Sequence, residues 1–252
     1  MDASLPQELT DKIIDEVAKY PDPSSRWGAL KASSLVSRAW VSRSQKYLFP
    51  TIKFDNGRFR DWSAMVRPGE NGPSSYVTRL HYRVDYYNAY PESLVNHRVY
   101  LSYFTNVQTL HLLGVGLNRT EYVSGFMQLR STIRSLELKN CCMNVNDLVT
   151  FLRPFTDLES LSLWNPYVRN DAKLDKRREL PTLKGQLDLC IGPHVGNSFL
   201  CELSRLPLAL SKITLENKTG VKEGVDRLLS ASRKTLAVII LEGKSFVHRS
   251  RL

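Results

Sequence analysis

A short apolar pattern recurs along most of the chain at a nearly constant interval. In each copy, two apolar residues flank one further residue, as in Leu136-Glu137-Leu138, and successive copies begin 25 to 30 residues apart. The copies are Ile52/Phe54, Leu80/Tyr82, Leu110/Leu112, Leu136/Leu138, Leu161/Leu163, Leu187/Leu189, Ile213/Leu215 and Ile239/Leu241. A period of roughly 20 to 30 residues is typical of repeat proteins, whose units bury their apolar faces only against their neighbours.

The alternation within each copy predicts a strand. Successive side chains of a strand point to opposite faces, so the flanking apolar residues point into the protein and the middle residue points outward. Between the strands we expect helices, with Asn146 and Asn197 at the N-caps of two of them and Val225 within a third. Residues 165–182 have a loop-like composition without a helical pattern.

The first fifty residues follow a different pattern. Apolar residues at helical spacing from Leu9 to Val17 predict one helix, which the Pro- and Ser-rich segment 21–25 ends. Two more helical runs, from Trp27 to Leu35 and from Trp40 to Leu48, precede Pro50. Three short helices bury little surface, so we expect part of their apolar surface to meet the following domain or a separate protein.

Both parts of the chain are similar to known families. The segments Leu5-Pro6-Gln7-Glu8-Leu9, Ile13-Ile14 and Leu35-Val36-Ser37-Arg38-Ala39-Trp40 resemble the F-box, in the form common in mushroom-forming fungi. The triplets, which most often follow another apolar residue by three positions, resemble leucine-rich repeats. The resemblance implies an α/β protein with two domains. Residues 1–50 would form a three-helix F-box, and residues 51–252 would form a short, irregular leucine-rich-repeat solenoid of about eight repeats, with parallel strands on its concave face.

The resemblance also implies a function. F-boxes dock on a Skp-family adaptor and, through it, on a cullin. By resemblance, Ile14, Val17 and Trp40 fill the helical core, and the following residues contact the adaptor: Leu5, Pro6, Leu9, Ile13 and Leu35. The chain would then be the non-catalytic, substrate-recognition subunit of a Skp–cullin–F-box type ubiquitin ligase, and it would present an unidentified protein target on its repeats.

The outward residues of the triplets indicate what the repeats bind. They are polar, with charges of both signs, which suits protein recognition better than recognition of a uniform anion. Our candidate substrate-binding residues are His111, Glu137, Ser162, Trp164 and Asp188. We prefer Trp164 as the anchor, because buried aromatic residues dominate interface energetics; the alternative is that it packs on the loop at 166–182. A second candidate is a group of tyrosines: Tyr82, Tyr86, Tyr87, Tyr90, Tyr100 and Tyr103. The alternative is that they belong to an inserted loop that packs on its own repeat.

The sequence contains no recognisable catalytic or metal-binding motif. The four cysteines lack C-x-x-C spacing, and we expect free, mostly buried thiols in the cytoplasm or nucleus, with only one thiol of the pair Cys141-Cys142 exposed. His81 and His111 fall one repeat apart and would be neighbours on the outward face, but no third ligand accompanies them. We therefore expect no metal, no cofactor and no enzymatic activity.

Charge and hydropathy leave two alternatives to the ligase role. The net charge is +10, and residues 51–252 supply +9 of it through 28 basic and 19 acidic side chains. Most of these basic residues are scattered, which favours a solvated surface over nucleic-acid binding. The alternatives are a leucine-rich-repeat scaffold without a ligase role and a basic nucleic-acid-binding protein. No apolar run approaches the roughly 20 residues of a membrane helix, so we expect no membrane contact.

Overall fold

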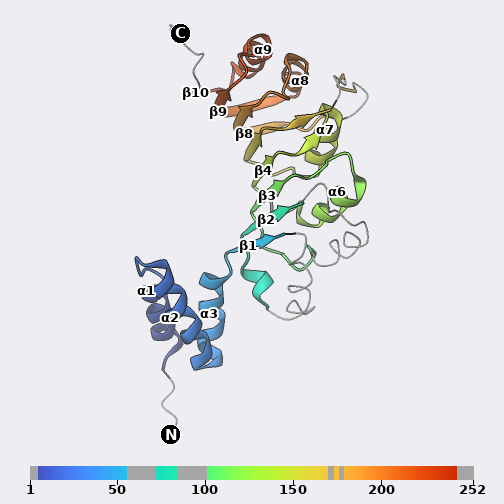
Figure 1. Cartoon of the computed structure of the whole chain (residues 1–252). Coiled ribbons are helices and arrows are strands. Elements are labelled where there is room, and N and C mark those ends of the chain that lie inside the picture. The colour runs from blue at the N-terminus through green and yellow to red at the C-terminus, as the bar shows by residue number, and fades with distance from the viewer. Residues whose placement is uncertain (1–4, 56–71, 85–100, 170–172, 176–178, 243–252) are drawn as a thin grey trace.

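The computed structural model describes residues 5–55, 72–84, 101–169, 173–175 and 179–242 (Figure 1). Three helices come first, and a long parallel sheet with helices along one of its faces follows them. The buried apolar residues form two separate clusters, a small one among the first three helices and a large one between the sheet and its helices. No helix in the described part of the chain has the length and hydropathy needed to cross a membrane.

The first three helices are α1 (Gln7–Val17), α2 (Pro23–Val36) and α3 (Arg38–Leu48). Asp22 caps α2 by accepting a hydrogen bond from the backbone of Ser25, and Pro23 occupies the first turn, where its missing N–H is not needed. The buried centre consists of Ile14, Leu30 and Leu48, against which Val17 and Trp40 pack, as expected from the sequence.

One ion pair joins the outer helices of this group. The Asp15 carboxylate of α1 accepts two hydrogen bonds from the Arg43 guanidinium of α3, at 2.6 and 2.7 Å, and a third from the Tyr47 hydroxyl at 2.8 Å. These hydrogen bonds lower the pKa of Asp15 to about 2, and the largest contribution comes from Arg43. The charged pair therefore holds α3 against α1 at the rim of a very small core.

Eight strands form one parallel sheet in which the strands follow chain order. They are β1 (Thr51–Phe54), β2 (Arg79–Arg83), β3 (Thr109–Leu113), β4 (Ser135–Lys139), β6 (Ser160–Trp164), β8 (Leu183–Ile191), β9 (Leu208–Asn217) and β10 (Val238–Glu242). The register aligns every apolar triplet with the next, so the alignment made from the sequence is confirmed. Both apolar positions of each triplet are buried from β1 to β9, whereas they stay half exposed in β10.

The segments between the strands cover one face of the sheet. They contain η1 (Pro73–Tyr76), α6 (Thr120–Phe126), η2 (Met127–Leu129), α7 (Val145–Leu152), α8 (Asn197–Leu203) and α9 (Glu223–Ser232). A second, two-stranded sheet of β5 (Cys142–Met143) and β7 (Tyr167–Val168) continues beyond the ends of β4 and β6. In Figure 1 α6, α7, α8 and α9 all lie on the same side of the long sheet, which leaves its other face uncovered by described helices.

Two predicted helix starts were wrong by one or two residues, and the asparagines involved have other roles. The N-cap of α7 is Asn144, which forms a reciprocal capping box with Asp147. Asn146 instead hydrogen bonds to the backbone of residues 173 and 175, and so fixes the loop that follows β7. Asn197 is the first residue of α8, and its side chain accepts a hydrogen bond from the backbone N–H of Gly224 at the start of α9. The described part of 165–182 contains no helix, as predicted.

The exposure predicted for the Cys141-Cys142 pair was also wrong. Both residues are buried, because the backbone of Cys142 pairs with Val115 and Leu117 on one side while β7 lies on the other. Cys190 is buried as well and Cys201 is partly exposed, and all four cysteines are free thiols. Burial raises the pKa of the Cys141 thiol to about 12, so this side chain is an inert part of the core.

Candidate functional site

The uncovered side of the sheet, here called the open face, carries the outward residues of every triplet. The strand register places the middle residues in one row across the sheet: Lys53, His81, His111, Glu137, Ser162, Asp188, Thr214 and Ile240. A neighbouring row at the carboxyl ends of the strands contains Arg83, Leu113, Lys139, Trp164, Cys190, Glu216 and Glu242. Four of the five predicted substrate-binding residues therefore stand in one row, and Trp164 stands in the next.

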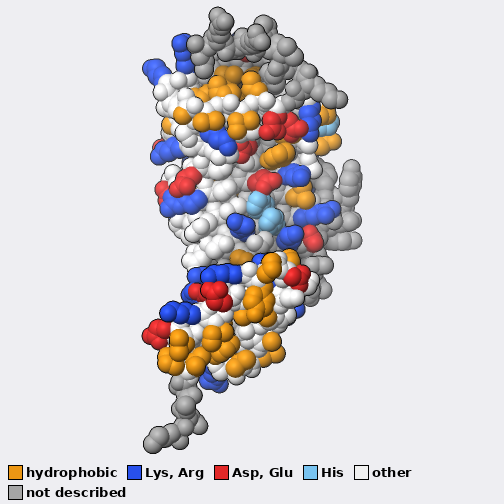
Figure 2. Space-filling model, turned by 90° about the vertical axis from the view of Figure 1, so that its left-hand side faces the viewer, with side chains coloured by type: hydrophobic (Ala, Val, Ile, Leu, Met, Phe, Trp, Pro, Cys, Tyr) orange, Lys and Arg blue, Asp and Glu red, His pale blue; other side chains and the backbone are white. Residues whose placement is uncertain are grey.

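A hollow of about 430 Å³ lies on the open face over β1 to β4. The rings of His81 and His111 stack in it with centroids 4.1 Å apart and almost parallel planes, which confirms the predicted neighbourhood of the two histidines. The Nδ1 atom of His111 hydrogen bonds to Glu137 on the next strand. The charged side chains around the rings are those of Lys53, Asp55, Arg83, Glu137 and Lys139. Figure 2 shows the histidines in the middle of this face with lysine and arginine side chains around them.

The electrostatic environment of the hollow is basic. Burial of the His81 ring, together with the nearby His111 and Lys53, lowers the pKa of His81. Among the residues that the structure describes, neither Lys53 nor Lys139 has an ion-pair partner. The sequence reasoning missed Lys53 and Arg83 as site residues. The signal for Lys53 was present, because it is the middle residue of the first apolar triplet.

The other predicted residues of the open face form a separate polar group over β6 and β8. The Asp188 carboxylate accepts hydrogen bonds from Ser162 at 3.2 Å and from Gln186 at 2.7 Å through one oxygen. Its second oxygen is buried without a hydrogen-bond partner among the described residues. Trp164 is 38% exposed, so its ring remains available to a ligand. His111 and Glu137 thus meet, Ser162 and Asp188 meet, and Trp164 stands beside Lys139 in register.

The tyrosine group is only partly within the described residues. Tyr82 belongs to the inward apolar set of β2 and is buried against Phe126, so its assignment to a binding surface was wrong. Its position as the second apolar residue of a triplet already indicated burial. Tyr103 is half buried, and the remaining four tyrosines (Tyr86, Tyr87, Tyr90 and Tyr100) lie outside the described residues.

A second surface stands out on the N-terminal helices. Leu5, Leu9 and Ile13 follow one another along α1 and its approach, and all three are exposed. Leu35, at the end of α2, is 86% exposed, and the adjacent Val36 is also exposed. The two groups are close, because the Gln7 side chain at the start of α1 donates a hydrogen bond to the Ala39 carbonyl just after the end of α2. Together with Pro6, these residues form what we call the apolar patch, visible in orange on the lower part of Figure 2.

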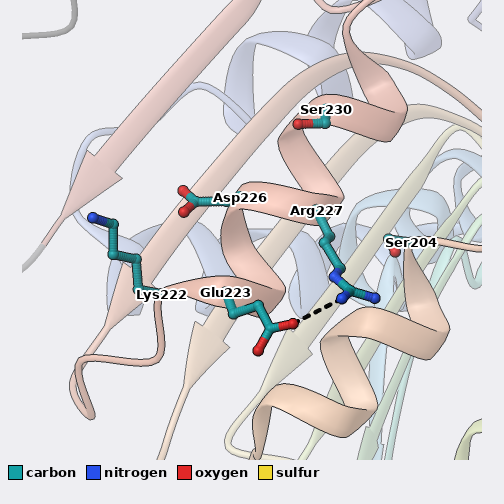
Figure 3. Close-up of a pocket in the computed structure, with 6 residues that line it drawn as sticks. All are labelled: Ser204, Lys222, Glu223, Asp226, Arg227 and Ser230. Carbon is teal, nitrogen blue, oxygen red and sulfur yellow. Dashed lines mark hydrogen bonds and ion pairs between the residues drawn. The ribbon is translucent and has the colours of Figure 1, made fainter.

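A second hollow, of about 600 Å³, lies on the outer side of the protein between α8 and α9. Its side chains carry both charges, and Arg227 is paired with Glu223 at 2.8 Å. In Figure 3 Arg227 extends towards Ser204 at the end of α8, whereas Lys222 and Asp226 point away from it. Because positive and negative side chains are balanced around this hollow, it does not indicate which kind of ligand would bind there.

Comparisons with known proteins add no identification. No protein-family model matches this chain, and no curated protein sequence matches it. The described residues contain no group of three or more His, Cys, Asp or Glu side chains arranged to hold a metal ion. The function must therefore be argued from the apolar patch and the open face.

Proposed function

We propose that this protein is the substrate-recognition subunit of a Skp–cullin–F-box type ubiquitin ligase, acting in the cytoplasm or nucleus. Its N-terminal helices form an F-box that docks on a Skp-family adaptor, and its sheet is a leucine-rich-repeat solenoid that presents a protein target. The chain itself catalyses nothing. It raises the effective concentration of the target near the transferring enzyme.

The apolar patch is the single observation that carries this proposal. The five residues expected to contact the adaptor by resemblance to the F-box are all on the surface, namely Leu5, Pro6, Leu9, Ile13 and Leu35. The residues expected to form the core of the same helices are instead buried or packed against the core. A stripe of leucine and isoleucine exposed on so small a helical unit is unfavourable in water and suits a partner that covers it.

The open face supports the second half of the proposal. It is a broad parallel sheet surface that carries polar side chains, one accessible tryptophan and a hollow lined by charged groups. This composition resembles that of a protein interface, with an aromatic anchor among hydrogen-bonding groups. The two surfaces belong to different parts of the chain, so adaptor and target can bind at the same time.

Co-expression of the full chain with a Skp-family adaptor, followed by size-exclusion chromatography, tests the proposal. We expect a stable one-to-one complex for the native protein and no complex for the Leu5→Ala/Pro6→Ala or Leu9→Glu variants. Tyr167→Ala, which truncates an exposed aromatic residue on β7, is the matched control and should bind normally. A monodisperse native chain that ignores the adaptor, or a Leu9→Glu variant that still binds, would contradict the docking assignment.

A further inference from the structure

We propose that the hollow over β1 to β4 binds an acidic side chain of the protein segment held on the open face, and that protonation of the stacked histidine pair strengthens this binding. The inference depends on the proposed function in one respect, namely that the anion belongs to a protein target.

The arrangement of donors is the first argument. Lys53, His81 and His111 follow one another in a single row, and adjacent parallel strands lie about 5 Å apart. Arg83 and Lys139 stand in the next row, on either side of Leu113. Side chains from the four neighbouring strands β1 to β4 thus surround a volume large enough for a carboxylate or a phosphate group together with the side chain that carries it. Hydrogen bonds from charged donors to such an anion are about twice as strong as neutral ones.

Glu137 provides the second argument, because it orients the imidazole beside it. Its carboxylate hydrogen bonds to Nδ1 of His111, which leaves Nε2 as the ring atom available to a ligand. When His111 is protonated, Nδ1–H donates to Glu137 and Nε2–H is a donor for an anion. Glu137 is therefore a positioning residue, and its negative charge also compensates the imidazolium.

The charges around the histidine pair set its proton balance. Two imidazolium rings stacked at 4.1 Å repel each other, and Lys53 of β1 and Arg79 of β2 add further positive charge near His81. Asp55, which directly follows β1, and Glu137 of β4 oppose this charge. The free site therefore favours neutral His81, consistent with its lowered pKa. A bound anion reverses this preference, so binding takes up protons and the affinity rises as the pH falls towards the pKa of His81.

Nuclear magnetic resonance titration of the full chain, labelled with ¹³C-histidine, tests this proposal. The probes are three acetylated and amidated pentapeptides of glycine and serine, with glutamate, phosphoserine or glutamine at the centre. We expect the glutamate and phosphoserine peptides to shift the ring signals of His81 and His111, and the glutamine peptide to leave them in place. A larger response to phosphoserine would identify a phosphorylated target, and a larger response to glutamate would identify an acidic one. Shifts of equal size with all three peptides would overturn the proposal, as would the absence of shifts.

The pH series uses the glutamate peptide, whose carboxylate stays ionised from pH 7.5 to 6.0, whereas a phosphoserine titrates near pH 6. Each proton taken up increases the affinity by at most about tenfold per pH unit, and we expect a gain of about threefold or more over this range. The gain should vanish in His81→Gln and persist in His194→Gln, because His194 stacks on Tyr167 away from the hollow. Equal gains in both variants would exclude His81 as the proton-linked group.

Lys53→Gln separates charge from packing, because it shortens no buried side chain. It should reduce the affinity for the glutamate peptide severalfold at both pH values. Adaptor binding is measured on the same samples and should be unchanged in every variant. If the native chain does not bind the adaptor but still responds to the peptides, the ligase role alone is refuted. Intact adaptor binding without a peptide response would refute only the anion site.

Discussion

Leu30 and Leu35 allow the sharpest test of the docking surface, because they share a helix but not an environment. Five residues apart in α2, they lie about 140° apart around the helix axis. Leu30 is 1% exposed in the small helical core, whereas Leu35 is 86% exposed in the apolar patch. The same substitution, Leu to Ala, should therefore affect different properties at the two positions.

Burial of a leucine side chain contributes about 1.5 to 3 kcal/mol, and nearly the whole of Leu35 remains to be buried by a partner. Leu35→Ala should therefore weaken adaptor binding by about 2 kcal/mol, or roughly 30-fold in Kd. Its free energy of unfolding should change by less than about 0.5 kcal/mol. Leu30→Ala should instead destabilise the helices by about 2 to 5 kcal/mol, since it leaves a cavity in a small core whose described residues include three buried apolar side chains.

Isothermal titration calorimetry with a purified Skp-family adaptor measures the first effect, and urea denaturation followed by circular dichroism measures the second. Ile240→Ala, which truncates an exposed aliphatic side chain on β10 outside the apolar patch, is the control for binding and should leave Kd unchanged. If Leu35→Ala binds the adaptor with the native Kd, the patch is not the docking surface. If it unfolds the helices, the exposure of Leu35 on which the reasoning rests is incorrect.

Three further outcomes follow from the structure. The hydrogen bonds from Arg43 lower the pKa of Asp15, so its stabilising effect is complete above the unfolded pKa near 4 and is lost as the pH falls towards 2. Acid titration followed by circular dichroism should show this loss of stability, and the Asp15→Asn variant should lack this pH dependence. Gly185→Ala should lower the free energy of unfolding, measured by urea denaturation, by at least about 2 kcal/mol. The reason is that φ is positive at Gly185 and a Cβ there would lie 2.1 Å from the Glu159 carbonyl oxygen. Cys141 should resist iodoacetamide in the native protein and react after denaturation, as peptide mass spectrometry would show; rapid native labelling would contradict its burial.

The strand ladder was predictable because it rests on a strong and repeated constraint. Only one register aligns all eight apolar triplets, and a shift of one residue would move every leucine from the covered face to the open face. The three helices were predictable for a similar reason, since their apolar residues recur at helical spacing. Helix starts were less certain, because Asn144 and Asn146 are equally good capping residues by type, and the tertiary contact of Asn146 with the loop at 173–175 decides between them.

The candidate site was only partly predictable. The adjacency of His81 and His111 followed from the repeat spacing, as did the presence of Glu137 in the same row, whereas the stacking of the two rings did not. The burial of Cys142 did not, because it depends on the small second sheet, which lies outside the triplets and has no periodic signal of its own. Tyr82 was assigned to a binding surface because six tyrosines lie close together in sequence, although Tyr82 occupies an inward position of its own strand and is buried.

The sequence by itself determined which residues point inward and which strands are neighbours, because apolar burial at a fixed period leaves a single consistent arrangement. Only the tertiary structure decided how the outward polar residues combine, since nothing apolar constrains them and their partners come from adjacent strands. It joined His111 to Glu137 and Ser162 to Asp188, and it left Leu35 of α2 in water while Leu30 filled the core. Side-chain packing and hydrogen bonding between distant segments made these choices, and they are the features on which the proposed functions depend.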